Sequence, residues 1–429
     1  METLPLDILL YIIVLLSDSA RYDYEDVKSL RNLSQTCKFM VPLCRKHLFS
    51  YRLLHSKEDS ERFSGLLLKN PDIAGYLRNL NYRFYLPISD HELKILEILK
   101  KCSSLKMIKL SSPGILEWND LPESMRSSLV FLIQLPSVTY LDIDDIIGFP
   151  ATALSGCSNL IDLRLGKLNL APEVNQVISR SRISTPVSLY MWKICHGLAY
   201  LLNSASPHAG GTIINFSRLQ KTVFDVEFQG DIGQINELIK VTSRLEHFNL
   251  NRERTGVVSY PSKFDRIFLV VQPLGLTGLG ASLAVNAYRT IKTLEFGVTV
   301  LGEEYGLLCG FNRELRFIAG NNILEVFRLY VDIVDETLFQ TESEDWSALD
   351  LVLTESGSFS MLHRVLVEIS WWSEDIGISE REAFLESLKE DKLSRLMKSK
   401  AVKLDFSAHF ADNDDISDDV SNDDASSLL

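Results

Sequence analysis

Three apolar residues in the spacing apolar-x-x-apolar-x-apolar recur through most of this chain. The last two apolar positions are two residues apart, so both point to the same side of a short strand. Successive copies start about 29 residues apart on average, at irregular intervals, and some repeats therefore carry insertions. The clear copies begin at Leu105, Val138, Leu160, Val223, Leu245, Ile291 and Leu324. Weaker copies, not all of which need be strands, begin at Leu77, Val187, Phe264, Leu362 and Ala401.

Helix-like stretches separate these phrases. Apolar residues recur at helical spacing within 92–101, 232–240 and 381–397. One strand and one helix per repeat, stacked side by side, predict an α/β solenoid over residues 56–410, with parallel strands inside and helices outside. Residues 411–429 are rich in Asp, Ser and Asn. They are expected to form an acidic disordered tail that is dispensable for folding, because they bury too little apolar surface to offset the entropy of ordering.

The first 55 residues follow a different pattern. Pro5 and Asp7 suit the first turn of a helix that carries apolar residues as far as Leu16. Two further short helices are predicted, one starting near Asp26 and one capped by Ser34 or Thr36. Three short helices have a thin core. This helical domain, residues 1–55, is therefore expected to lean on the rest of the chain or on a partner.

Composition and charge narrow the classes of partner. With 46% hydrophobic residues in 429, the chain is expected to fold. A formal net charge of -13 argues against nucleic acid or an anionic membrane as the main partner, although seven aspartates between 412 and 424 carry over half of it. The six cysteines form no CxxC pair and fit reduced thiols in the cytoplasm or nucleus. The apolar run 8–16 is too short to span a bilayer.

The N-terminal residues resemble the F-box. The likeness rests on Leu4-Pro5-x-Asp7-Ile8-Leu9-x-x-Ile12-Ile13, on Leu30-x-x-Leu33-Ser34-Gln35-Thr36-Cys37-Lys38 and on Pro42-Leu43-Cys44-Arg45-Lys46-His47-Leu48-Phe49. The third segment is similar to a phrase common in fungal F-box proteins. The stretch 17–25 is long for this family, and the tryptophan often found in the third helix is absent. Both departures bear on how tightly the unit binds its partner.

Resemblance to the F-box implies binding to a Skp-type adaptor and, through it, to a cullin. The chain would then be the substrate-recognition subunit of an SCF-type cullin–RING E3 ubiquitin ligase. It would do no covalent chemistry itself, and would hold a client protein near the ubiquitin-carrying enzyme. The residues expected to form or support the adaptor surface are Leu4, Pro5, Ile8, Leu9, Ile12, Leu33, Cys37 and Leu43.

The repeats resemble leucine-rich repeats, which often follow an F-box. Two copies have the cysteine-type form, Cys102-x-x-Leu105-x-x-Ile108-x-Leu110 and Cys157-x-x-Leu160-x-x-Leu163-x-Leu165. Pro113 and Leu168 stand where an asparagine usually follows. This resemblance implies a curved solenoid whose concave face is the sheet.

The residues that flank the middle apolar position of each phrase point away from the core, onto this concave face. They include charges of both signs, which suit a protein client better than a polyanion. In the copies beginning at Val187 and Val223, the flanking residues are Leu189, Met191, Asp225 and Glu227. Aromatic residues and arginine tend to dominate protein interfaces. The client contacts are therefore predicted at Tyr140, Arg164, Arg328 and Arg364.

Motifs for chemistry are weak. Gly275-x-x-Gly278-x-Gly280 lacks the lysine of a phosphate loop and the glycine order of a dinucleotide-binding turn, so we interpret it as a flexible connection between repeats. Cys37, Cys44 and His47 lack a fourth local ligand for zinc. We expect no catalytic site, metal or cofactor. Two alternatives stay open: a leucine-rich-repeat scaffold whose N-terminal helices only cap the solenoid, and an unrecognised hydrolase.

Overall fold

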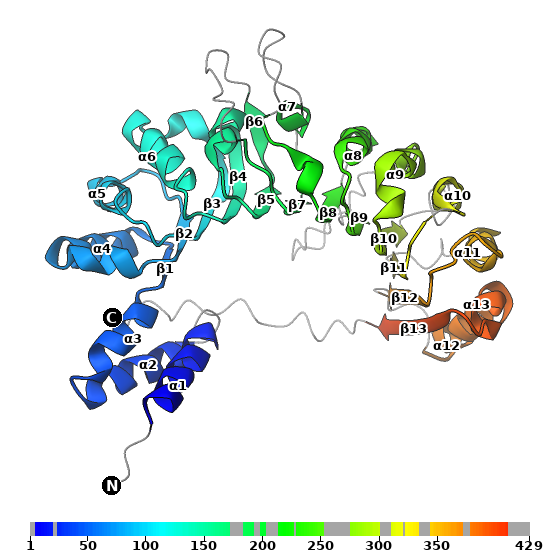
Figure 1. Cartoon of the computed structure of the whole chain (residues 1–429), viewed down its shortest axis with the longest axis horizontal. Helices are drawn as coiled ribbons and strands as arrows, with labels where there is room; N and C mark the ends of the chain where they lie inside the picture. The colour runs from blue at the N-terminus through cyan, green and yellow to red at the C-terminus, as the bar shows by residue number, and fades with distance from the viewer. Residues whose placement is uncertain are drawn as a thin grey trace, which may run out of the picture. The chain divides into compact units, whose positions relative to one another are not determined.

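The computed structural model describes residues 5–19, 24–171, 183–192, 198–202, 213–226, 229–252, 275–300, 310–320, 322–333, 344–371 and 378–410. It divides into two compact units. Unit 1 comprises Met1–Met191 and Cys195–Phe216, and unit 2 comprises Trp192–Ile194 and Ser217–Leu429. In each unit, the repeats form a parallel sheet with helices along one of its faces (Figure 1).

Unit 1 begins with three helices and continues as strand–helix repeats. The first helices are α1 (Leu6–Ser19), α2 (Tyr24–Thr36) and α3 (Met40–Leu48). The strands, in spatial order, are β1 (Tyr51–Leu54), β2 (Asn79–Arg83), β3 (Met107–Glu117), β4 (Tyr140–Pro150), β5 (Asp162–Gly166) and β7 (Ser188–Trp192), and β6 (Asn169–Ala171) pairs with β4. The helices of these repeats are α4 (Lys57–Lys69), η1 (Pro71–Tyr76), α5 (Asp90–Leu99), η2 (Trp118–Asp120), α6 (Glu123–Ile133), η3 (Ala151–Gly156) and α7 (Leu198–Leu202).

Unit 2 repeats the same alternation of strand and helix. Its strands are β8 (Lys221–Val226), β9 (His247–Arg252), β10 (Thr293–Val300), β11 (Val326–Ile333), β12 (Arg364–Trp371) and β13 (Lys403–Phe410), and each pairs in parallel with the next. Its helices are η5 (Phe216–Arg218, at the boundary between the units), α8 (Gln229–Val241), α9 (Leu279–Asn286), η6 (Ala287–Arg289), α10 (Phe311–Ile318), α11 (Glu344–Thr354), α12 (Ile378–Ser387), the π-turn η8 (Leu388–Lys392) and α13 (Ser394–Lys398).

Most of the described strands enter the sheet through the same hydrogen-bond arrangement. The carbonyl oxygen just before one strand accepts from two consecutive amides just before and at the start of the next, as Lys106 does from Thr139 (2.9 Å) and Tyr140 (3.1 Å). In unit 2 the same arrangement joins Lys292, Glu325 and Val326. This repeated bond sets the register in which the strands stack. It confirms the predicted parallel sheet with helices as a repeat architecture.

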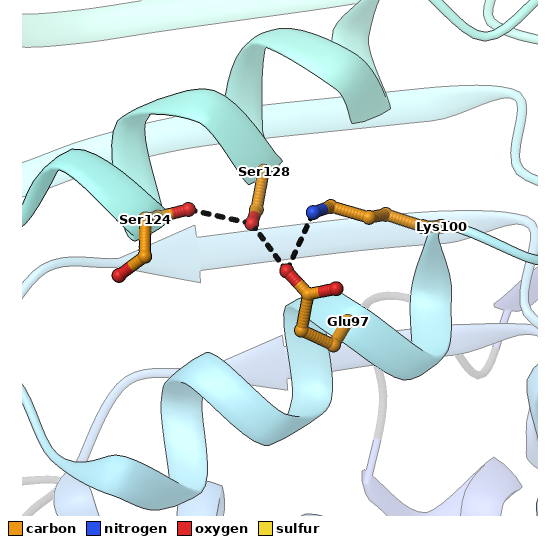
Figure 2. Close-up of polar contacts among 4 residues, drawn as sticks. All are labelled: Glu97, Lys100, Ser124 and Ser128. Carbon is orange, nitrogen blue, oxygen red and sulfur yellow. Dashed lines mark hydrogen bonds and ion pairs between the residues drawn. The ribbon is translucent and has the colours of Figure 1, made fainter.

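The helices of adjacent repeats are also joined by side chains. Ser128 on α6 is buried, and its single O–H has two acceptors within hydrogen-bond distance, the Glu97 carboxylate on α5 (2.8 Å) and the Ser124 carbonyl (2.6 Å) (Figure 2). Lys100 donates to the same carboxylate oxygen of Glu97. Hydrogen bonds from Lys100 and Ser128 lower the pKa of Glu97 below its ordinary value. The layer of helices in unit 1 is thus held by polar contacts as well as by apolar packing.

The apolar phrases form the core, as the spacing predicts. Leu105, Ile108 and Leu110 are all buried, and a chain of phenylalanine rings fills the equivalent space in unit 2. Phe248 lies 6.0 Å from both Phe224 and Phe296, measured between ring centroids. The side chains that face the helices are therefore mostly apolar in both units, with exceptions such as Thr222, and most of the polar strand residues lie on the other face of the sheet.

Two of the predicted phrases are placed wrongly. Leu189 and Met191 were expected on the concave face, but both are buried and it is Tyr190 that lies half-buried between them. A shift of one residue along a strand moves every side chain to the opposite face of the sheet. Because residues 189–192 are four consecutive apolar residues, the sequence does not show which of them face the core. In β8 the buried residues are Thr222, Phe224 and Val226. Val223, where the predicted phrase begins, therefore lies on the opposite side of the strand from the core. Asp225 remains on the exposed side of β8.

Residues 1–55 contain a strand as well as three helices. β1 pairs in parallel with β2, and Arg52 occupies the position opposite the buried Leu80. The Arg52 guanidinium lies over the rings of Phe49 (5.1 Å) and Phe63 (5.3 Å). A cation on the core side of a strand hides the apolar pattern, and the strand was therefore not predicted.

The Gly275–Gly280 segment ends in the start of a packed helix rather than in a flexible connection. Gly278 precedes α9 with a φ of 85°, which a residue with a side chain rarely adopts. Gly280 lies in the first turn of α9, and its amide donates to the buried carboxylate of Glu314 on α10 (2.8 Å). These two glycines allow the helix to turn and to approach its neighbour.

Several predicted features lie outside the described residues. They are Leu4, Glu227, the phrase that begins at Phe264 and the acidic tail 411–429.

Candidate protein-interaction surfaces

The three N-terminal helices enclose a small core of their own. Ile13, Leu30, Met40 and Cys44 are each at most 3% exposed. Partly buried apolar residues from the same three helices surround them, namely Leu9, Leu16, Leu33, Leu43 and Leu48. Burial raises the pKa of the Cys44 thiol, with a smaller contribution from the neighbouring Cys37, so this cysteine acts as an apolar core residue. The core of the helical unit is thus built without residues of the sheet.

Helix α1 keeps many apolar side chains outside this core. Leu6, Ile8 and Tyr11 are 50%, 45% and 64% exposed, and Leu10 and Ile12 are 40% and 37% exposed. A helix that packs on two others can bury one stripe of its surface, whereas α1 is apolar around most of its circumference. A contiguous exposed apolar patch on a folded chain marks a site of protein or membrane interaction.

The predicted adaptor residues divide into exposed and supporting ones. Pro5, Ile8, Ile12 and Cys37 are exposed. Leu9, Leu33 and Leu43 are partly buried against the small core and support it. The prediction did not include Leu6, Tyr11 and the 56% exposed Phe39. The unbroken apolar run 8–16 in α1 was the signal for Tyr11, because one helix face cannot bury all of its side chains.

The repeats present a second kind of surface, on the sheet face opposite the helices. In unit 1 we call this the open face. The described residues that define it are Met107, Lys109, Tyr140, Asp142, Asp144, Asp162, Arg164 and Tyr190. Tyr140 and Arg164 were predicted as client contacts, and the parallel register places them on adjacent strands. Ordinary alternation along the strands positions all of these side chains.

Aromatic rings and an arginine form one part of this face. The Arg164 guanidinium lies over the rings of Tyr140 (5.1 Å) and Tyr190 (4.4 Å). Burial raises the pKa of Tyr140 to about 12, with further contributions from nearby carboxylates that Arg164 partly offsets. Tyr140 therefore remains neutral at physiological pH. Tyr190, which belongs to the phrase placed in the wrong register, was missed by the prediction.

Buried carboxylates form the other part. Asp142 is 4% exposed, and its Oδ2 accepts from the Lys109 ammonium at 3.4 Å. Burial raises the pKa of Asp142, and the nearby charges of Lys109 and Arg164 only partly offset this. Burial likewise raises the pKa of Asp144, and the negative charges of Asp145 and Asp142 add to the effect. Ionisation of either carboxylate therefore costs stability in the folded state.

Asp142→Asn is expected to make the protein more stable than the wild type at pH 7. The folded-state pKa of Asp142 is raised, so ionisation costs stability as the pH rises from the unfolded pKa to the folded one. Asparagine does not ionise. Its advantage should therefore shrink as the pH falls towards about 4, where the aspartate of the unfolded chain also becomes protonated. Urea denaturation at pH 7 and near pH 4 measures the difference.

Asp405→Asn is the matched control. Hydrogen bonds from Lys403 and Arg364 lower the pKa of Asp405, so its ionised form contributes stability above the ordinary carboxyl pKa. This variant should lose stability at pH 7, the opposite sign to Asp142→Asn. Equal signs for the two variants would contradict the assignment of burial as the dominant cause at Asp142.

The open face of unit 2 carries paired charges. It is defined by the described residues His247, Asn249, Thr293, Glu295, Val326, Arg328, Tyr330, Arg364, Leu366, Glu368, Asp405 and His409. Arg328 pairs with Glu295 (3.6 Å), and Arg364 pairs with Asp405 (2.6 Å). His409 lies 3.5 Å from Glu368. The two predicted client residues of this unit, Arg328 and Arg364, therefore have acidic partners within the chain.

Nothing among the described residues forms a group of three or more His, Cys, Asp and Glu side chains that could hold a metal ion. In the same residues, no helix is both long enough and apolar enough to cross a membrane.

Comparison with known proteins adds little to this description. No protein-family model matches the chain, and no curated protein matches it either. A solved structure of an internalin from Listeria monocytogenes is similar over 84% of this chain and 92% of its own, at 11% sequence identity and a TM-score of 0.31. A likeness of this size is too slight to extend what the strands and helices themselves show.

Proposed function

We propose that this chain is the substrate-recognition subunit of an SCF-type cullin–RING E3 ubiquitin ligase. In this proposal α1–α3 bind a Skp-type adaptor, which links the chain to a cullin, and the open faces of the repeats bind a client protein. The observation that carries the proposal is the exposed apolar surface of α1, which includes Leu6, Ile8, Tyr11 and Ile12. Such a surface gains stability when a partner helix covers it.

The division into two surfaces suits this role. The helical unit has its own core, so it can present α1 without depending on the packing of the sheet. The sheet faces carry charged and aromatic side chains on adjacent strands, which is the pattern of a protein-binding surface. By holding the client beside the ubiquitin-carrying enzyme, the chain would contribute proximity rather than a reacting group.

Ile8→Asp combined with Ile12→Asp is expected to weaken binding to a purified Skp adaptor by at least about 100-fold. Each apolar anchor is worth roughly 1.5–3 kcal/mol when it is buried at an interface, and a carboxylate there adds a desolvation cost. Both side chains are exposed, and they lie one helical turn apart on the same side of α1. Biolayer interferometry with the full chain measures the affinity.

Ile115→Asp combined with Phe131→Asp provides the control. These side chains are 77% and 48% exposed, lie on β3 and α6, and introduce the same two charges away from α1. Adaptor binding should be unchanged. If the folded wild-type chain does not bind the adaptor, or if the α1 variant binds it as tightly as the wild type, the ligase role is wrong. The chain would then be a repeat scaffold whose helices have another purpose.

A further inference from the structure

The open face of unit 1 contains carboxylate oxygens that have no hydrogen-bond partner among the residues that the structure describes. The Oδ1 atoms of Asp142 and Asp144 are both buried, and neither accepts a hydrogen bond from this described part of the chain. Asp142 has one cationic partner, Lys109, and that contact is made by Oδ2. Buried polar atoms in native proteins are nearly always hydrogen-bonded, so these two oxygens, on neighbouring side chains of one strand face, have acceptor capacity that the described residues do not use.

Unit 2 provides a contrast on the same kind of surface. Glu295, Asp405 and Glu368 each have a cationic or imidazole partner within the chain, at 3.6, 2.6 and 3.5 Å. Repeats of this architecture therefore can satisfy the acids of their open face internally. The missing partners at Asp142 and Asp144 are a local property of unit 1, and they leave negative charge that a cation can neutralise.

The neighbouring aromatic side chains indicate what shape that cation has. Tyr140 and Tyr190 already hold the planar guanidinium of Arg164 at 5.1 and 4.4 Å, so these rings accommodate a flat cation. Met107 stands opposite Tyr140 in the register and is half-buried. Aromatic and thioether side chains suit the aliphatic stem of a lysine or arginine, while its charged head reaches a carboxylate.

We infer that the open face of unit 1 binds a basic side chain, arginine or lysine, presented by the client protein. Asp142 and Asp144 accept hydrogen bonds from the charged head, and Tyr140, Tyr190 and Met107 pack against its stem. The inference rests on the proposed function in that the client is the protein held by the repeats. It deepens that function by stating which chemistry selects the client.

Three fluorescein-labelled decapeptides test this inference. Serine alternates with arginine in the first peptide, with lysine in the second and with glutamate in the third. Fluorescence anisotropy measures their binding to the full chain. The arginine or lysine peptide should bind and the glutamate peptide should not. Asp142→Asn combined with Asp144→Asn should weaken binding of the basic peptide by about tenfold or more, because it removes charge-assisted hydrogen bonds. Which basic peptide binds more tightly distinguishes guanidinium from ammonium recognition.

Glu61→Gln combined with Glu237→Gln is the matched control. Both glutamates are exposed on helices, α4 and α8, and their replacement removes the same two charges. This variant should bind the basic peptide as the wild type does. No binding of either basic peptide, or equal weakening in the two double variants, would overturn the inference, since the second result would reflect overall charge alone.

Adaptor binding of the same variants separates this inference from the proposed function. Asp142→Asn combined with Asp144→Asn should bind the Skp adaptor with wild-type affinity, because neither residue lies in α1–α3. Intact adaptor binding together with the negative peptide results above would overturn only the basic-client inference. Failure of the adaptor to bind the wild type, with peptide binding that depends on the two aspartates, would leave the inference in place and overturn the ligase role.

Discussion

Gly280→Ala is expected to destabilise unit 2 by about 3 kcal/mol, an effect typical of severe overpacking in a well-packed interior. A Cβ at this position would overlap the backbone oxygen of Glu314 and lie 2.7 Å from its carbonyl carbon. These are backbone atoms of α10, so no side-chain rotation relieves the clash. To accept the alanine, α9 and α10 must separate, which weakens the bond between the Gly280 amide and the Glu314 carboxylate.

Gly233→Ala provides the control for this prediction. Gly233 lies on α8, where a Cβ would meet no atom within 4 Å. Alanine is favoured over glycine inside a helix by roughly 0.5–1 kcal/mol, so this variant should be slightly more stable than the wild type. Urea denaturation of both variants gives the comparison. A Gly280→Ala protein as stable as Gly233→Ala would show that the two helices are not in close contact.

Asn322→Ala is expected to cost about 3 kcal/mol of stability, because the carbonyl of Ile318 and the amide of Leu324 lose a buried side-chain partner. The carbonyl of Ser358 also loses a bond, although it still accepts from the amide of Gly320 (2.7 Å). The Asn322 amide donates to the carbonyls of Ile318 (2.8 Å) and Ser358 (2.7 Å) and accepts from the amide of Leu324 (3.2 Å). It lies in the turn between α10 and β11 and reaches the turn of the following repeat. An apolar replacement of smaller size supplies none of these bonds.

Asn286→Ala is the matched control for this asparagine. Asn286 is exposed and makes one described side-chain bond, to the carbonyl of Lys240. Water can replace that bond, so the loss should stay below about 1 kcal/mol. Thermal unfolding measures the stability of both variants, which have the same length and the same net charge. Similar losses at the two positions would contradict the role of Asn322 as a buried connection between repeats.

Periodicity in the sequence was sufficient for the architecture, because it is a local property of each repeat. Leu105, Ile108 and Leu110 are separated by the spacing that a strand and its entering turn require, and all three are buried. The prediction went wrong where neighbouring side chains blur that spacing. Apolar residues stand at every position from 189 to 192, and Arg52 takes the place of an apolar residue in β1.

The role of Gly280 in helix packing could not be predicted from the sequence for a related reason. The glycine spacing in 275–280 resembles that of a loop, and no pattern indicates that the backbone of residue 314 lies against residue 280. The same holds for the asparagine at 322, whose second partner, Ser358, is 36 positions away. Contacts between repeats depend on how the repeats stack, and a single repeat does not contain that information.

The interaction surfaces, too, were determined in part by the sequence and in part by the tertiary structure. The sequence by itself determined that the first helix is too apolar to bury all its side chains, and that alternating strand residues such as Tyr140 and Arg164 share a face. Only the tertiary structure decided which charges on that face are paired. Lys109 and Asp142 are 33 positions apart, and whether a carboxylate has a partner depends on strand register and burial, neither of which local spacing specifies.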